Sequence, residues 1–315
     1  MSAVRSVTLE PGVWSVVPTP FRGPDDELDE ESLVTLASFY ERVGVAGLTV
    51  LGVFGESARL SMAERRRVLQ VVANSSALPL VVGITALATA PAVEEAATLA
   101  AAAEGRVVAM MAQVGCADAR CLRTHFRRLH EATGLAVVVQ DYPQASGVTV
   151  GPRVLADALK GEPWVAGVKA ESPPTALAVG HLAMALREVP VFGGLGGVGL
   201  LDELAAGAAG AMTGFSFPEG LRDCVAAYGE GGFAPARAAL LPYLPLVCFE
   251  QQPGIGLGIR KEALRRRGLL REALVRAPGT PMPKELSGQL DRHMEAASSA
   301  ALGPARPPAR GTMHA

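Results

Sequence analysis

The sequence predicts a single α/β domain of the (β/α)₈ type, a TIM barrel, with a C-terminal helical extension. Two observations support this fold class. Short apolar runs recur through residue 213, each bounded by glycine, proline or polar residues. Stretches with helical spacing of apolar residues separate these runs, and a repeated strand–helix alternation is typical of a closed parallel barrel. An open doubly wound sheet has the same alternation and is the main alternative.

Eight apolar runs have the length expected of buried parallel strands. They cover residues 13–17, 47–51, 80–82, 107–111, 136–139, 165–168, 191–192 and 211–213.

The segments between the strands predict helices. Apolar residues recur at three- and four-residue spacing in 33–43, 62–73 and 93–103. Ser61 followed by Glu64 forms a capping-box pattern, which predicts that the second of these helices begins directly after Ser61. Later helices are expected near residues 118–132, 152–159, 174–187 and 199–206.

The strand pattern fades after residue 217. Four further segments have helical character, at 221–228, 234–249, 259–267 and 284–299. We therefore predict a barrel over residues 1–217 and a helical extension, packed on the barrel, over 218–300. The proline-containing tail, 301–315, is expected to be disordered.

Composition and charge narrow the function classes. The chain has 315 residues, 49% of them hydrophobic, with a net charge of -2 and a pI near 6.2. This balance favours neither nucleic acid nor a membrane surface as a partner. Neither a signal-like apolar core at the N-terminus nor an apolar run of membrane-spanning length is found, so we expect a cytoplasmic protein. The cysteines at 116, 121, 224 and 248 form no CxxC pair, which predicts reduced thiols and no zinc site. We expect no other metal and no cofactor.

One of the four lysines is distinguished by its position. The other three fall in polar or basic segments and are interpreted as solvated charges: Lys160, Lys261 and Lys284. Lys169 ends the apolar run 164–168, at the carboxyl end of the sixth strand, where barrels place catalytic residues. Loss of hydration there favours the neutral amine, which attacks a ketone to form an imine. A structural ion pair with Glu171 or Glu56 is the alternative interpretation.

Four segments, in chain order, carry a resemblance to a known family. They are V-P-T-P-F at 17–21, G-V-F-G-E-S at 52–57, L-S-x-x-E-R at 60–65 and G-V-K at 167–169. With them the chain resembles the dihydrodipicolinate synthase / N-acetylneuraminate lyase family, as a divergent member, over residues 12 to 290. The resemblance implies a Schiff base between Lys169 and a 2-oxo acid such as pyruvate. It also implies a homo-oligomer, either a dimer or a tetramer.

The resemblance places the substrate carboxylate at the turn formed by Val53, Phe54, Gly55 and Glu56. The family has two threonines where this chain has Val53 and Phe54, so only backbone N–H groups remain to bind the acid there. The position of the family's catalytic tyrosine holds Gln140, and a glutamine cannot relay a proton as a phenol does.

Further candidate site residues lie at the ends of later strands. Residues two apart in a strand share a face, so one hypothesis is that Tyr142 takes the role vacated at Gln140; the other is that Tyr142 only packs beside Pro143. Ser146 matches a hydroxyl residue of the family that precedes a glycine, and is expected to touch substrate. Gly194 opens a G-x-G-x-x-G pattern, interpreted as a loop that approaches substrate closely rather than a dinucleotide site, and Thr213 lies on the neighbouring rim.

Together these residues predict a Schiff-base-forming lyase of the aldolase or dehydratase type. Lys169, Tyr142 and Gln140 are the catalytic candidates. The alternative is a barrel with altered chemistry that binds a small molecule or acts as a scaffold. The replaced tyrosine and threonines favour that alternative, whereas the retained G-V-K at 167–169 counts against it.

Overall fold

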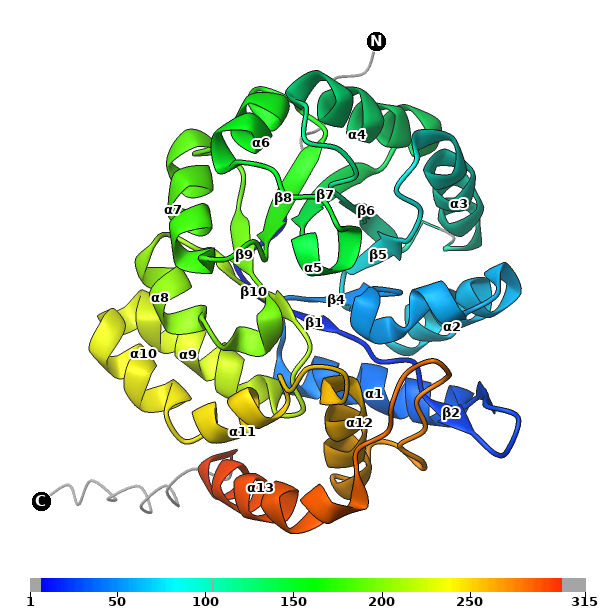
Figure 1. The fold of residues 1–315 in the computed structure, drawn as a ribbon, viewed down its shortest axis with the longest axis vertical. Coiled ribbons are helices and arrows are strands. Elements are labelled where there is room, and N and C mark those ends of the chain that lie inside the picture. Colours follow the sequence, from blue (N-terminus) through cyan, green and yellow to red (C-terminus); the bar gives the residue numbers. More distant parts are fainter. Residues whose placement is uncertain (1–6, 104, 302–315) are drawn as a thin grey trace, which may run out of the picture.

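The computed structural model describes residues 7–103 and 105–301, and its centre is a closed barrel of eight parallel strands (Figure 1). The strand order is β1-β10-β9-β8-β7-β6-β5-β4, with β1 pairing β4 to close the ring. All eight predicted strands are confirmed, and the open doubly wound sheet is excluded. The strands are β1 (Gly12–Val16), β4 (Gly47–Val50), β5 (Leu80–Ile84), β6 (Val107–Gln113), β7 (Ala136–Asp141), β8 (Val165–Ala170), β9 (Val191–Gly193) and β10 (Gly210–Thr213).

The seven helices predicted between the strands are also confirmed, within a few residues at their ends. They are α1 (Glu30–Val43), α2 (Met62–Ser75), α3 (Thr89–Ala102), α4 (Ala119–Thr133), α6 (Pro152–Leu159), α7 (Thr175–Ala185) and α8 (Leu200–Ala205). The capping box at α2 is present in both directions: Glu64 N–H donates to Ser61 Oγ at 3.2 Å, and Ser61 N–H donates to the Glu64 carboxylate at 2.8 Å.

A layer of large side chains fills much of the barrel interior. Trp14, Met111, Phe192 and Met212 pack there in one buried cluster. Gly47 makes room for the indole, because a Cβ on this glycine would lie 2.3 Å from the Trp14 ring. The polar side chains described below lie beside this layer, at the carboxyl ends of the strands.

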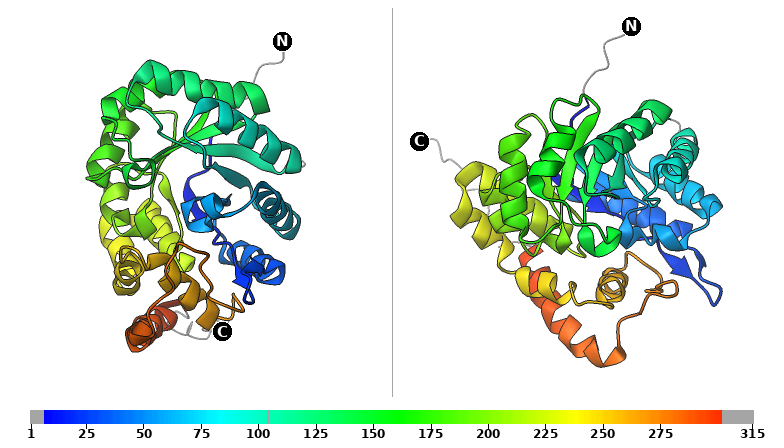
Figure 2. Two further views of the ribbon diagram at one scale, coloured as in Figure 1. Left: turned by 45° about the vertical axis from the view of Figure 1, so that its right-hand side comes forward. Right: turned by 45° about the horizontal axis from the view of Figure 1, so that its top comes forward.

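The helical extension forms one side of the molecule (Figure 2). After β10 the chain continues through α9 (Pro218–Gly231), α10 (Phe233–Leu240), α11 (Leu244–Phe249), α12 (Gly256–Arg266) and α13 (Ser287–Ala301). The first of these, α9, packs against β1, α1 and α8 and so takes the place of the barrel's eighth helix; the helices beyond the barrel therefore begin with α10. Between β1 and α1 lies a short hairpin, β2 (Phe21–Arg22) with β3 (Glu27–Leu28), that the sequence pattern did not predict. Of the tail predicted to be disordered, 301–315, Ala301 ends α13 and the rest lies outside the described residues.

The prediction for the cysteines is wrong at two positions. Cys116 and Cys121 are joined by a disulfide, because the loop after β6 folds back on the first turn of α4 and brings their Cα atoms to 6.7 Å. Cys224 and Cys248 are free, as expected.

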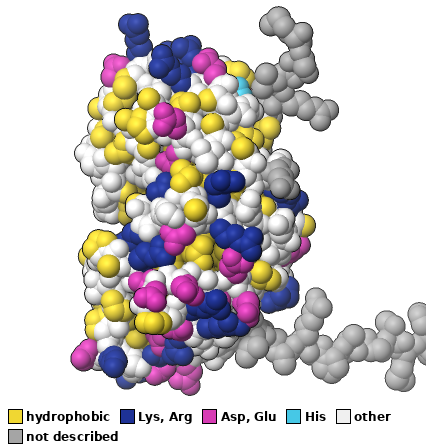
Figure 3. Space-filling view, turned by 90° about the vertical axis from the view of Figure 1, so that its right-hand side faces the viewer, with side chains coloured by type: hydrophobic (Ala, Val, Ile, Leu, Met, Phe, Trp, Pro, Cys, Tyr) yellow, Lys and Arg dark blue, Asp and Glu magenta, His cyan; other side chains and the backbone are white. Residues whose placement is uncertain are grey.

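Two surface findings bear on partners. Among the described helices none combines the length and apolar character needed to cross a membrane. On the face shown in Figure 3, basic and acidic side chains are intermixed rather than separated by sign, in keeping with the small net charge of -2.

One buried acid in the barrel wall makes stability depend on pH. Glu203, on α8, is 1% exposed and lies against the backbone of β9, where a Cβ on Gly193 would meet its carboxylate at 1.7 Å. Burial raises the pKa of Glu203 from 4.5 to about 7. The folded protein therefore holds this proton more tightly than the unfolded chain does, and stability must fall as pH rises between these values.

We predict that Glu203→Gln removes this pH dependence. Between pH 4.5 and pH 8 the wild type should lose on the order of 3 kcal/mol in free energy of unfolding through this group, and the variant should not show this loss. Urea denaturation across this range measures the difference, with the exposed Glu230→Gln as the matched control. If the free energy of unfolding changed with pH equally in wild type and Glu203→Gln, the raised pKa would not belong to Glu203.

Candidate active site

The carboxyl ends of β7 and β8 bring together an amine, a carboxylate and an amide. Lys169 is 5% exposed, and its Nζ lies 3.1 Å from Oε2 of Glu171. The same oxygen accepts a hydrogen bond from Nε2 of Gln140 at 2.7 Å. Gln140 and Lys169 are also register partners across the two strands. The ion pair foreseen as an alternative therefore exists, and Glu171 is shared between the two predicted catalytic residues.

The glycine loop after β9 fixes the other oxygen of Glu171. Oε1 accepts a hydrogen bond from the N–H of Leu195 at 3.1 Å. Gly194 has to be a glycine here, because a Cβ at that position would lie 2.2 Å from Oε1. The sequence predicts that this loop approaches substrate closely; in the structure, Gly194 closely approaches the side chain of Glu171. Thr213 supports the same loop, since its Oγ1 accepts from Gly196 N–H at 2.8 Å.

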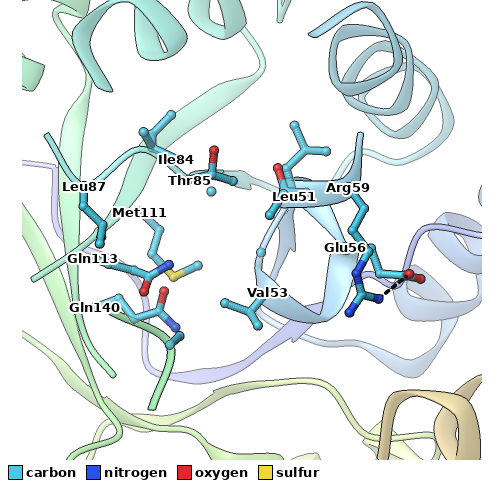
Figure 4. A pocket seen from close by; sticks show the side chains of 15 residues that line it. Leu51, Val53, Glu56, Arg59, Ile84, Thr85, Leu87, Met111, Gln113 and Gln140 are labelled. Carbon is cyan, nitrogen blue, oxygen red and sulfur yellow. Dashed lines mark hydrogen bonds and ion pairs between the residues drawn. The ribbon is translucent and has the colours of Figure 1, made fainter. Parts of the chain in front are cut away.

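A cavity of about 350 Å³ opens beside this trio, at the ends of β4 to β7 (Figure 4). Gln140 belongs to its lining and connects it to Glu171. The amide groups of Gln113 and Gln140 lie side by side in Figure 4, with Thr85 across from them. Apolar side chains complete the lining, among them Leu51, Val53, Ile84, Leu87 and Met111. The cavity combines a few polar groups with apolar walls, as sites for small molecules do.

The predicted acid-binding turn lies at the edge of this cavity. Val53 opens the 3₁₀ turn η1 (Val53–Gly55), whose first N–H groups have no partner within the turn. Two residues that flank it are in the left-handed region, Leu51 (φ 60°) and Glu56 (φ 55°). Non-glycine residues in this region are strained, and such strain is commonly found at functional sites. Gly55 packs closely against β1, with its carbonyl accepting from the Thr19 hydroxyl at 2.6 Å.

Glu56 anchors the turn to the C-terminal extension. Its carboxylate accepts hydrogen bonds from Lys261 of α12, from Arg59 at 2.8 Å and from the N–H of Arg276 at 3.0 Å. The interpretation of Lys261 as a solvated charge is therefore wrong, because its side chain is 0% exposed. Burial lowers the pKa of Lys261 to about 8, while Glu56 acts in the opposite direction.

Tyr142 does not continue the strand that carries Gln140. β7 ends at Asp141, and Tyr142 begins the short helix α5 (Pro143–Ser146), so the shared-face argument does not reach it. Its side chain lines a second cavity of about 530 Å³, together with Phe54 and Leu195. Burial and the charge of Glu171 raise the pKa of Tyr142, whereas Arg260 lowers it.

Two other polar residues lie near the site. The hydroxyl of Ser146, which the sequence predicts to touch substrate, donates to the carbonyl of Tyr142 at 3.2 Å and accepts from the N–H of Val148 at 3.2 Å. Ala145, from the same turn, is the residue that lines the first cavity. Asp141 is buried, and this burial together with the Glu171 charge raises its pKa to about 6. Its side chain follows Gln140 in the strand and faces the opposite way.

Comparison with known proteins agrees with this architecture. The model of the dihydrodipicolinate synthetase family matches residues 10–297. An L-2-keto-3-deoxyarabonate dehydratase of Azospirillum brasilense is 31% identical over 87% of this chain and 89% of its own length. A 4-hydroxy-tetrahydrodipicolinate synthase of Methanothrix thermoacetophila is 30% identical, over 46% of this chain and about half (49%) of that relative.

Among solved structures, a dihydrodipicolinate synthase from Rhodopseudomonas palustris superimposes with a TM-score of 0.84 at 30% identity. The alignment covers 92% of this chain and 100% of that one. These matches support an enzyme of the lyase type.

The buried Glu56–Lys261 pair yields a stability prediction. Lys261→Met should lower the free energy of unfolding by about 3–5 kcal/mol, because it leaves a buried carboxylate without its closest cation. Urea denaturation measures this loss. Lys160→Met, at an exposed lysine, is the matched control and should stay within about 0.5 kcal/mol of wild type. Equal effects of the two substitutions would mean that Lys261 is solvated after all.

Proposed function

Because the chain belongs to the dihydrodipicolinate synthetase family, we propose that it is a Schiff-base dehydratase that acts on a hydroxylated 2-oxo acid through Lys169. The observation that carries the proposal is the position of Glu171, which contacts Lys169 at 3.1 Å and Gln140 at 2.7 Å. A carboxylate at this distance can exchange protons with the amine and with the carbons next to an imine formed on it.

The first step joins Lys169 to the substrate. The amine must give up a proton before it can attack, and Glu171 is the neighbouring group that accepts it. The neutral Nζ adds to the keto carbon, C2, and the keto oxygen leaves as water. The resulting protonated imine withdraws electrons from C3, which makes the C3 protons acidic.

The second step removes water from the substrate chain. Glu171 takes a proton from C3, and the electron pair forms an enamine with the imine carbon. The enamine then expels the hydroxyl group on C4, with a proton returned by Glu171, so that water leaves and a C3–C4 double bond forms. Hydrolysis of the imine frees Lys169. Gln140 has no proton to relay in this scheme and acts by orienting Glu171.

The first cavity suggests the substrate class. Amide groups of Gln113 and Gln140 and the hydroxyl of Thr85 are suited to hydrogen bonds with hydroxyl groups of a short carbon chain. The relative that is aligned over 87% of the chain is named as a dehydratase of a 2-keto-3-deoxy sugar acid. We therefore propose a substrate of that chemical class, with an aldolase reaction on the same imine as the second candidate.

Proton exchange in pyruvate tests the roles of Lys169 and Glu171 before the true substrate is known. Wild type should exchange the pyruvate methyl protons with D₂O, because the imine makes them acidic. Lys169→Ala should abolish exchange without changing the circular dichroism spectrum. Glu171→Gln should slow exchange by about 10²–10⁴-fold, as expected for a lost general base, while still forming the imine. Unchanged exchange in Glu171→Gln would remove Glu171 from the mechanism.

We also propose that the protein is a homo-oligomer, in which the outer face of α7 takes part. Leu177 and Met184, seven residues apart on one face, are 57% and 78% exposed. Wild type is expected to sediment as a dimer or tetramer. The double substitution Leu177→Glu and Met184→Glu should reduce the mass by at least half, whereas Phe233→Glu, at an exposed residue of α10, should not. A monomeric wild type would contradict the proposal.

A further inference from the structure

A buried arginine of the extension has hydrogen-bond donors that nothing accepts. Arg260 lies on α12 and is 1% exposed. Its Nε donates to Oε2 of Glu250 at 2.9 Å. Its Nη1 and Nη2 are buried and find no acceptor within residues 7–103 and 105–301. Buried donors of a charged group are nearly always satisfied, so two unsatisfied nitrogens on one guanidinium point to an anionic ligand.

Glu250 is not free to satisfy these donors. Its Oε1 accepts a hydrogen bond from the Ser216 hydroxyl, and its Oε2 accepts from the Ser216 N–H at 3.3 Å as well as from Arg260 Nε. The carboxylate is thus held on one edge of the guanidinium. The two Nη groups, on the other edge, are presented to a second anion in the paired geometry that carboxylates prefer.

The position of Arg260 places these donors at the barrel mouth. Its guanidinium stacks on the ring of Phe54, 3.9 Å from the ring centroid. Nη1 would lie 2.9 Å from a Cβ on Gly214, the residue that follows β10. Stacking covers the face of the guanidinium, so the two buried Nη groups can meet a ligand only along the in-plane edge.

Arg260 is not itself in the lining of the second cavity, but two of its neighbours are. Phe54 and Glu250, which both contact Arg260, line that cavity, and so does Leu195. The N–H of Leu195 binds Glu171. The Glu171 carboxylate is thus bonded both to Gln140, in the lining of the first cavity, and to Leu195, in the lining of the second.

We propose that Arg260 binds the carboxylate of the 2-oxo acid, an inference that rests on the proposed function. With C2 on Lys169 and the hydroxylated chain in the first cavity, the C1 carboxylate extends toward Phe54 and the second cavity. The guanidinium then supplies the charge and donors that Val53 and Phe54 lack in their side chains. Arg260 is in this account a substrate-binding residue contributed by the C-terminal extension.

Borohydride trapping with two ketones of the same length tests the proposal. Pyruvate carries the carboxylate, and hydroxyacetone has an uncharged hydroxymethyl group in its place. Labelling of the protein is followed by intact mass as a function of ketone concentration. Arg260→Lys retains a cation for Glu250 but loses both Nη groups. The matched control is Arg266→Lys, on the same helix, whose side chain binds Glu262 and Asp291.

Arg260→Lys should raise the half-saturating pyruvate concentration about tenfold or more, the effect of losing a charge-assisted hydrogen bond, and leave that of hydroxyacetone unchanged. Arg266→Lys should match wild type with both ketones. Gly214→Ala crowds Nη1 but keeps the arginine, so it should weaken the binding of pyruvate and not that of hydroxyacetone. It serves as the second variant should Arg260→Lys fail to fold. If Arg260→Lys weakened the binding of both ketones equally, or of neither, the proposal would be overturned.

A non-covalent measurement separates this proposal from the imine chemistry. In a Lys169→Met background no imine forms at that position, and pyruvate should still raise the melting temperature when Arg260 is present but not in Arg260→Lys. If wild type is never labelled by borohydride, the proposed function fails, while the thermal shift still decides whether Arg260 binds the carboxylate. The absence of any Arg260-dependent shift would overturn the carboxylate site.

Discussion

The carboxylate of Glu171 is the point on which the site depends, because it forms an ion pair with one element and accepts hydrogen bonds from two others. Lys169 reaches it from β8, Gln140 from β7, and the N–H of Leu195 from the loop after β9. The glycine loop is shaped around this carboxylate, since a Cβ at Gly194 would overlap it. In the proposed mechanism this carboxylate is the proton acceptor of Lys169, so amine activation and proton transfer share one group.

The C-terminal extension completes the mouth of the barrel through two buried ion pairs. Lys261 holds Glu56, and with it the turn at Val53–Gly55, while its neighbour Arg260 pairs with Glu250 and stacks on Phe54. Buried pairs of this kind contribute little net stability, but removing one partner is costly because the other charge stays buried. The extension and the turn therefore have to fold together, and the site is assembled from residues far apart in the chain.

The barrel was predictable because each strand and helix carries its own periodic signal, and Lys169 because it ends an apolar run. The partners of that lysine were only partly predictable. Glu171 follows it by two residues, but the Gln140 contact depends on the register between β7 and β8. Lys261 looked solvated because Arg260, Arg265 and Arg266 surround it in sequence; its burial depends on Glu56, 205 residues away. The position of Tyr142 was predicted from the alternation of side chains along a strand, but β7 ends at Asp141, one residue before it.

The most direct measurement is to locate the imine. Lys261 is a second buried lysine, and its lowered pKa, about 8, makes it the competing amine. The protein is reduced with borohydride in the presence of a panel of 2-oxo acids, pyruvate and 2-keto-3-deoxy acids included, and its peptides are mapped by mass spectrometry. We expect a single adduct, on Lys169. An adduct on Lys261, or none with any acid of the panel, would contradict the account and favour a barrel that binds a small molecule without imine chemistry.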